Sequence, residues 1–179
     1  MSKPKRQAVR EAKHIRRHEN FLEKGNNRTL FGPIKPRNKK QQELLEAFEH
    51  YRIVLATGLA GTGKSLCAMS WAIEALERGQ VERIIITRPM VGCDEEIGFL
   101  PGTEDEKYIG WVGPMLEIAQ GKLGKARATS LVDANIIDPQ PLMRMRGSTF
   151  RNSVVILDEA QNTTEGQMKM FLTRLGEGS

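Results

Sequence analysis

Three short runs of apolar, largely β-branched residues stand out along this chain: RIVLAT at residues 52–57, RIIIT at 83–87 and VVILD at 154–158. Strands with one solvated face alternate apolar and polar side chains, whereas strands covered on both faces are apolar at successive positions. The three runs therefore predict buried strands of a parallel sheet with helices on both faces, which is an α/β fold.

Segments with helical periodicity separate these runs. Residues 65–79 end at Gly79, a residue typical of helix termini, and one stripe of this predicted helix is apolar: Leu66, Met69, Ile73 and Leu76. Other predicted elements are helices at 38–50, 112–120 and 164–175, the last with an N-cap at Thr163 or Thr164, a short strand at 134–137 and a loop at 138–147. Two glycine- and proline-containing stretches before residue 38 separate a leader, residues 1–35, from a domain, residues 36–179.

The segment GLAGTGKS, residues 58–65, fits the phosphate-loop pattern GxxxxGK[ST] and lies between a predicted strand and a predicted helix. Its glycines let successive N–H groups turn toward a phosphate, and the helix start adds positive potential. Lys64 is predicted to reach the β- and γ-phosphates of ATP, and Ser65 to ligate Mg²⁺. The alternative is a glycine-rich turn without a ligand. The nucleotide site (Walker A) is predicted at Gly58, Leu59, Ala60, Gly61, Thr62, Gly63, Lys64, Ser65 and Leu66.

The run VVILDEAQ, residues 154–161, predicts the catalytic half of the site (Walker B). Asp158 stands at the carboxyl end of a strand, where a phosphate-loop enzyme places a carboxylate for Mg²⁺. Glu159 can act as the general base that takes a proton from the attacking water. Gln161 is placed to sense the γ-phosphate. The alternatives are that the acidic pair only caps a helix and that Gln161 faces solvent.

Two features predict contact with nucleic acid. Thr87 and Arg88 end the second strand, at the same sheet edge as the phosphate loop, although an arginine there can also be an ordinary surface residue. Residues 1–40 hold 13 Lys and Arg against 3 Glu, a charge of +10, whereas residues 41–179 hold 14 against 19, a charge of −5. A cationic arm binds phosphate backbones through counterion release, and the alternative is a solvated leader, partly disordered.

Composition limits the class of protein. Of the 179 residues, 39% are hydrophobic and 27% charged, and no apolar run approaches the roughly 18 residues that a membrane span needs. The leader lacks the apolar core of a secretory signal. Cys67 and Cys93 form no CxxC pair and are predicted to be small buried side chains, which suits a reducing cytoplasm.

Together with the phosphate loop, the segments TRPMVGCDEEIGFLPG, EKYIGWVGPMLE, PLMRMRGSTF and ILDEAQNTTEGQMKMFLTRLG resemble the PhoH family of phosphate-loop ATPases, which is related to superfamily 1 helicases. The resemblance implies a RecA-like core, ATP with Mg²⁺ and a link to RNA. It leaves assembly open, with a homo-oligomer as one candidate because ring formation is common among RecA-like enzymes. It also implies that Gln41 recognises adenine. Arg146 lies in a family segment that precedes the DEAQ strand, but the resemblance assigns no role to this arginine.

The chain departs from this family in two places. It carries a basic leader, and it stops at TRLGEGS, where the resemblance implies a further core strand ending in Gly-Asp and a region with an arginine for the γ-phosphate. That strand would lie between residues 52–57 and residues 154–158, so the C-terminal core strands are expected to be absent. The hypothesis is that the chain is a fragment, and the alternative is that the remaining strands move together and close the gap.

The predicted function is Mg²⁺-dependent ATP hydrolysis coupled to RNA or other nucleic-acid binding, in the manner of a helicase. The first alternative is a nucleotide-dependent binding module with little or no hydrolysis. The second is a small-molecule phosphotransferase, which shares the glycine loop but rarely has a DEAQ motif.

Overall fold

The structure, a computed structural model, describes residues 32–90 and 104–179. Most of the leader, Cys93 and the segment GFLPG lie outside the described residues. Within them, three strands form a parallel sheet in the order β2-β1-β3: β1 (Arg83–Thr87), β2 (Ile137–Pro139) and β3 (Ser153–Leu157). The predicted α/β fold with a helix-flanked parallel sheet is confirmed.

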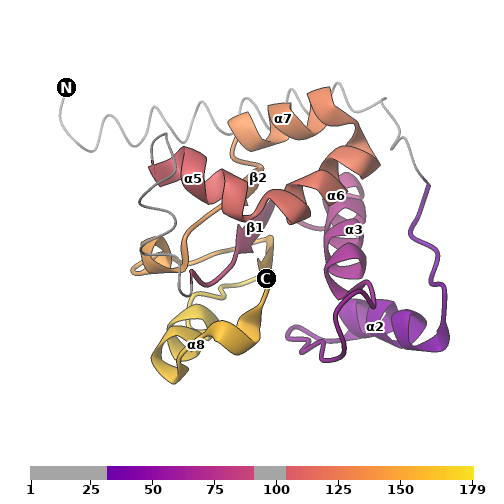
Figure 1. Cartoon of the computed structure of the whole chain (residues 1–179), viewed down its shortest axis with the longest axis horizontal. Helices are drawn as coiled ribbons and strands as arrows, with labels where there is room; N and C mark the ends of the chain where they lie inside the picture. The colour runs from indigo at the N-terminus through magenta and orange to yellow at the C-terminus, as the bar shows by residue number, and fades with distance from the viewer. Residues whose placement is uncertain (1–31, 91–103) are drawn as a thin grey trace.

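Helices cover both faces of this sheet (Figure 1). The central strand alternates its side chains between them: Ile84 and Ile86 pack with the helices of one face, and Ile85 packs on the other with Phe171. The first face is covered by α3 (Lys64–Glu77), α5 (Glu104–Trp111), α6 (Gly113–Leu123) and α7 (Lys125–Asp133), and the second by α8 (Glu165–Leu172) and the 3-10 helix η1 (Leu142–Met145).

Several helix predictions are confirmed with shifted ends. Helix α2 (Lys39–His50) begins after Asn38, whose side chain accepts from the Gln41 amide. Helix α8 has a capping box between Thr164 and Gln167, so Thr164 is the N-cap. This helix stops at Leu172 because the backbone then turns, and Thr173 is its C-cap.

Other predictions need correction. The short strand β2 starts at Ile137 instead of Ala134, because Asn135 adopts a left-handed conformation (φ 56°) that ends α7 before the strand can start. Part of the predicted loop at 138–147 is the 3-10 helix η1. Leu66 does not belong to the buried stripe of α3, since it is 42% exposed while Met69, Ile73 and Leu76 are buried.

The largest correction concerns residues 52–57, which were predicted to be a buried strand. They form no strand, and Ile53 and Leu55 are 55% and 77% exposed. A strand needs a hydrogen-bonding neighbour. Within the described residues none pairs with this segment, and β3 is an edge strand. Arg52 instead ties the segment to the last residues of the chain by donating to the carbonyls of Gly176 (3.0 Å) and Ser179 (3.2 Å).

Candidate functional site

The phosphate loop adopts a backbone that glycine makes accessible. Gly58, Gly61 and Gly63 all have positive φ, at 147°, 74° and 86°. Gly63 immediately precedes α3, and a β-carbon there would lie 2.9 Å from the Gln41 side-chain nitrogen. A side chain at this position would therefore strain the backbone and displace the Gln41 amide from the loop.

The first turn of α3 faces this loop without a side-chain cap. The first N–H groups of a helix have no partner inside it, and the helix dipole makes this end attractive to anions. The first intrahelical bond in α3 runs from the Cys67 amide to the Gly63 carbonyl (2.9 Å). The local sequence thus supplies backbone donors next to the loop, as a phosphate requires.

Lys64 lies across the loop. Its ammonium donates to the carbonyls of Gly58 and Leu59, both at 2.9 Å, and is 3.4 Å from the Thr62 hydroxyl. Within residues 32–90 and 104–179 the ammonium has no carboxylate partner. A cation held only by uncharged oxygens can exchange them for phosphate oxygens without breaking an ion pair.

Ser65 and Asp158 meet although they are 93 residues apart in sequence. The Ser65 hydroxyl donates to the Asp158 carboxylate at 2.8 Å. The Asp158 amide donates to the Thr87 carbonyl (2.9 Å), so the ladder between β1 and β3 fixes the position of this carboxylate. Oxygen ligands of these two types are those that Mg²⁺ takes beside a phosphate, with waters completing its shell. No group of three or more acidic, histidine or cysteine side chains in the described parts could hold a metal alone.

Glu159 follows in a left-handed backbone conformation (φ 53°, ψ 39°), which is uncommon for a residue other than glycine. Its carboxylate oxygens have separate partners. One accepts from the side-chain amide of Gln161 (2.5 Å), and the other lies 3.8 Å from the Arg88 guanidinium. The structure therefore places Gln161 beside the Glu159 carboxylate, a contact that was not predicted, while the role of Gln161 as a γ-phosphate sensor stays a prediction.

Gln41 lies against the phosphate loop. Its side-chain nitrogen donates to the Thr62 carbonyl (3.0 Å), and its oxygen accepts from the Arg37 amide (2.8 Å). Adenine recognition would require Gln41 to exchange these partners, and this role also stays a prediction. Leu59 (82% exposed) and Leu66 can contribute to a nucleotide site through the backbone, as can Ala60.

Arg88 has supporting contacts that the sequence reasoning missed. Its backbone amide donates to the Tyr108 hydroxyl (3.0 Å), and its guanidinium carbon lies 5.0 Å from the centre of the Trp111 ring. Tyr108 in turn donates to the Gln140 carbonyl (2.9 Å). The sequence feature that could have predicted these contacts is the segment EKYIGWVGP, whose two aromatic residues lie three positions apart on α5. Arg146 is exposed and caps η1, with no contact to the phosphate loop shown.

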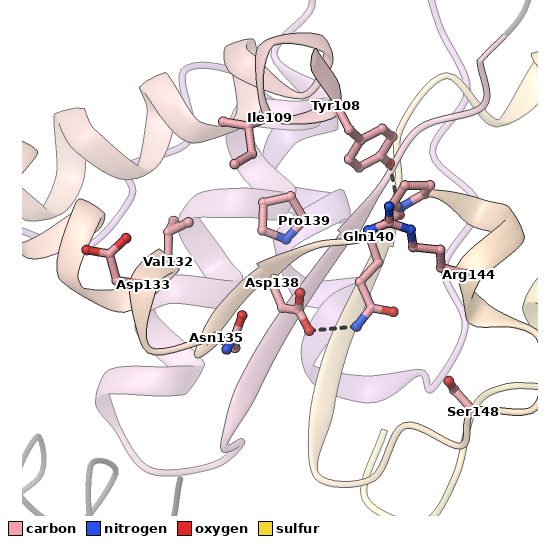
Figure 2. A pocket seen from close by; sticks show the side chains of 11 residues that line it. Tyr108, Ile109, Val132, Asp133, Asn135, Asp138, Pro139, Gln140, Arg144 and Ser148 are labelled. Carbon is pink, nitrogen blue, oxygen red and sulfur yellow. Dashed lines mark hydrogen bonds between the residues drawn. The ribbon is translucent and has the colours of Figure 1, made fainter. Parts of the chain in front are cut away.

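A cavity of about 530 Å³ lies beside strand β2, between α5, the end of α7 and β2 itself. Figure 2 shows Tyr108, Asp138 and Gln140 on its walls, with the Gln140 amide donating to the Asp138 carboxylate (2.6 Å). Burial raises the pKa of the Tyr108 hydroxyl above its ordinary value, so this group stays protonated and able to donate over a wider pH range. None of the residues that line the cavity belongs to the phosphate loop. Tyr108 instead links the cavity to Arg88, whose side chain lies beside Glu159.

Sequence similarity to known proteins covers most of the chain. The sequence profile of the family described as PhoH-like protein matches residues 33–179. The chain belongs to the PhoH-like protein family. Protein PhoH of Escherichia coli (strain K12) is 46% identical over 147 residues, which cover 81% of this chain and 42% of that protein. PhoH-like proteins of Bacillus subtilis (strain 168) and Mycobacterium tuberculosis (strain H37Rv) are each 44% identical over 146 residues, 82% of this chain.

The chain spans less than half the length of these relatives, 46% for the Bacillus subtilis protein and 42% for the other two. The PhoH-like family is one of P-loop NTPase-like proteins, which supports nucleotide binding at the loop of residues 58–65. The described residues contain no helix that is long and apolar enough to cross a membrane.

Proposed function

We propose that this chain binds ATP with Mg²⁺ at the phosphate loop and hydrolyses it, and that hydrolysis is coupled to single-stranded RNA or another nucleic acid. The hydrogen bond between Ser65 and Asp158 is the observation that carries this proposal. It joins the phosphate loop to the acidic end of β3, which is the juxtaposition that a metal-bound triphosphate needs. Bound ATP and Mg²⁺ would supply the reactive phosphate and the charge that activates it.

The chain's own residues divide the work. Backbone amides of residues 58–66 and the Lys64 ammonium bind the phosphates, and Ser65 with Asp158 holds the metal. Glu159 accepts the proton of the attacking water, and Gln161 orients the Glu159 carboxylate. Gln41 contacts the base. Nucleic acid contacts Arg88 at the sheet edge and the basic leader. Thr87 was also predicted to contact it, but this residue is 0% exposed, so that part of the prediction is wrong. A homo-oligomer and a cytoplasmic location are part of the same proposal.

A nucleotide-dependent binding module with little hydrolysis is the second candidate. One observation favours it: both oxygens of the Glu159 carboxylate are engaged by other side chains, Gln161 and Arg88. A general base needs an oxygen that is free to accept a proton. In this arrangement ATP could bind and order the surface without being cleaved.

Binding and turnover measured side by side separate the two functions. Affinity is read with a fluorescent ATP analogue, and turnover as phosphate release with and without single-stranded RNA. Glu159→Gln should keep the affinity and lower turnover by roughly 10² to 10⁴, the usual contribution of a general base. Lys64→Ala should weaken nucleotide binding about ten- to a hundredfold, since it removes charge-assisted bonds to phosphate.

Glu177→Gln is the matched control, because Glu177 is exposed and its carbonyl is bound to Asn152 just before β3, at the opposite end of the strand from Asp158. This variant should change neither quantity. Normal affinity without turnover in the unmodified chain would support the binding module, and absence of nucleotide binding would refute both functions.

A further inference from the structure

Arg88 occupies an unusual place, between an aromatic ring and the carboxylate of the proposed base. The guanidinium carbon lies 5.0 Å from the Trp111 ring centre, and one of its nitrogens lies 3.8 Å from a Glu159 oxygen. The Arg88 side chain is 25% exposed and that of Glu159 is 39% exposed. Both partners of this pair can therefore be reached from solvent.

The backbone on both sides of the pair is fixed. Thr87 pairs with Leu157 in the parallel ladder, so the residues that follow each strand leave the sheet side by side. The Arg88 amide is bound to the Tyr108 hydroxyl, and Tyr108 is only 3% exposed. The distance between Arg88 and Glu159 can therefore change by side-chain rotation while the strands stay in place.

The contact itself is weak. A nitrogen-to-oxygen distance of 3.8 Å is close to the limit for an ion pair, and a pair this exposed contributes little stability because water screens both charges. Arginine is also well matched to phosphate, to which it can donate two parallel hydrogen bonds, and the Trp111 ring supports the guanidinium plane. A phosphodiester group can therefore compete with Glu159 for Arg88.

We propose that Arg88 is a positioning residue that restrains Glu159 until a phosphate of a single-stranded nucleic acid binds Arg88. The inference rests on the proposed function and deepens it, because it names the contact through which nucleic acid would regulate hydrolysis. Without nucleic acid, Arg88 and Gln161 each occupy one oxygen of the carboxylate. When Arg88 turns to the phosphodiester, one oxygen of Glu159 becomes free to take the proton of the attacking water.

Competition has a consequence that does not involve hydrolysis. If Glu159 and a phosphodiester compete for Arg88, the two interactions are thermodynamically linked. The free energy by which nucleic acid weakens the pair of Arg88 and Glu159 must equal the free energy that nucleic-acid binding gains when the Glu159 charge is removed. An exposed pair contributes up to about 1 kcal/mol, so Glu159→Gln should bind up to about fivefold more tightly. Arg88→Gln should abolish this gain.

Tryptophan fluorescence can report the contact directly. The chain has two tryptophans, Trp71 and Trp111, so Trp71→Phe leaves Trp111 as the single probe. In this background, single-stranded oligouridylate is added without nucleotide at fixed salt. We expect a change of Trp111 emission on binding and tighter binding for Glu159→Gln. Arg88→Gln should lose the emission change.

The control for charge alone is again Glu177→Gln, which removes one negative charge at the opposite end of the strands. If it strengthens oligouridylate binding as much as Glu159→Gln does, the competition model is wrong. It is equally wrong if Arg88→Gln keeps the Trp111 response. A Trp111 response to ATP with Mg²⁺ as large as that to oligouridylate would assign Arg88 to the nucleotide and also overturn the proposal.

Phosphate release tests the regulatory half. Arg88→Gln should raise basal turnover severalfold at unchanged nucleotide affinity and should no longer respond to oligouridylate, whereas Arg88→Lys should keep part of the response. Lower basal turnover in Arg88→Gln would mean that Arg88 assists hydrolysis instead of restraining Glu159. If no variant hydrolyses ATP, the proposed function fails, and the fluorescence titration still decides whether Glu159 and nucleic acid compete.

Discussion

The run RIIIT at residues 83–87 forms the central strand β1, whereas the similar run RIVLAT at residues 52–57 forms no strand. The side chains of Ile84, Ile85 and Ile86 are fully buried, while Ile53 and Leu55 are exposed. Both runs begin with an arginine. Arg83 forms an ion pair with Asp138 of the neighbouring strand β2, but Arg52 reaches only carbonyls near the end of the chain.

The difference shows that an apolar run becomes a strand only when partners are available. Strand β1 has β2 on one side and β3 on the other, and these ladders satisfy its backbone groups. The two ends of the phosphate loop are therefore held by segments that differ in burial. The phosphate loop is anchored on its C-terminal side by the buried helix α3 and on its N-terminal side by an exposed segment.

Hydrogen exchange should show the largest contrast between the two runs. Amides of β1 exchange only through openings whose free energy approaches that of global unfolding, about 5–15 kcal/mol for a typical domain. Their exchange rates should therefore be lowered by roughly 10³ or more. Residues 53–57 donate no backbone hydrogen bond to the described backbone and should exchange almost freely. Mass spectrometry of exchanged peptides measures both, and similar protection in the two peptides would contradict the exposed state of residues 52–57.

Alanine substitutions should separate the runs energetically. Ile85→Ala removes a side chain that is 0% exposed and should cost about 2–5 kcal/mol of unfolding free energy. Leu55→Ala removes one that is 77% exposed and should cost less than about 0.5 kcal/mol. Urea midpoints give the comparison. A loss for Leu55→Ala as large as that for Ile85→Ala would show that residues 52–57 pack against the domain in solution.

Thiol chemistry should give a smaller but direct measure. Cys67 is 1% exposed on α3, and burial raises the pKa of its thiol, so less thiolate is present at a given pH and its reaction with a disulfide reagent shifts to more alkaline pH. In a Cys93→Ser background, Leu55→Cys should react rapidly at pH 8 while Cys67 reacts slowly. Both should react at similar rates in urea, and the Cys93→Ser protein without Leu55→Cys is the control. Fast reaction of Cys67 in folded protein would show that α3 is less well covered than the structure indicates.

Much of the candidate site followed from the sequence because its parts are local. The glycines of residues 58–63, Lys64 and Ser65 are consecutive, and Asp158 and Glu159 directly follow an apolar run. The two groups meet in the Ser65 to Asp158 bond, although residues 52–57 form no strand. Helix α3, which packs on β1 and β3, carries Ser65 to this edge of the sheet. The contacts of Arg88 with Trp111 and Glu159 could not be predicted this way, because they depend on how α5 packs beside the sheet.

The sequence by itself determined the α/β class, the helices around the sheet and the residues of the phosphate loop, since these depend on short-range patterns of apolar and glycine positions. Tertiary structure decided which apolar run became a strand and that Arg88 lies beside Glu159, because the strand partners and this arginine come from distant segments.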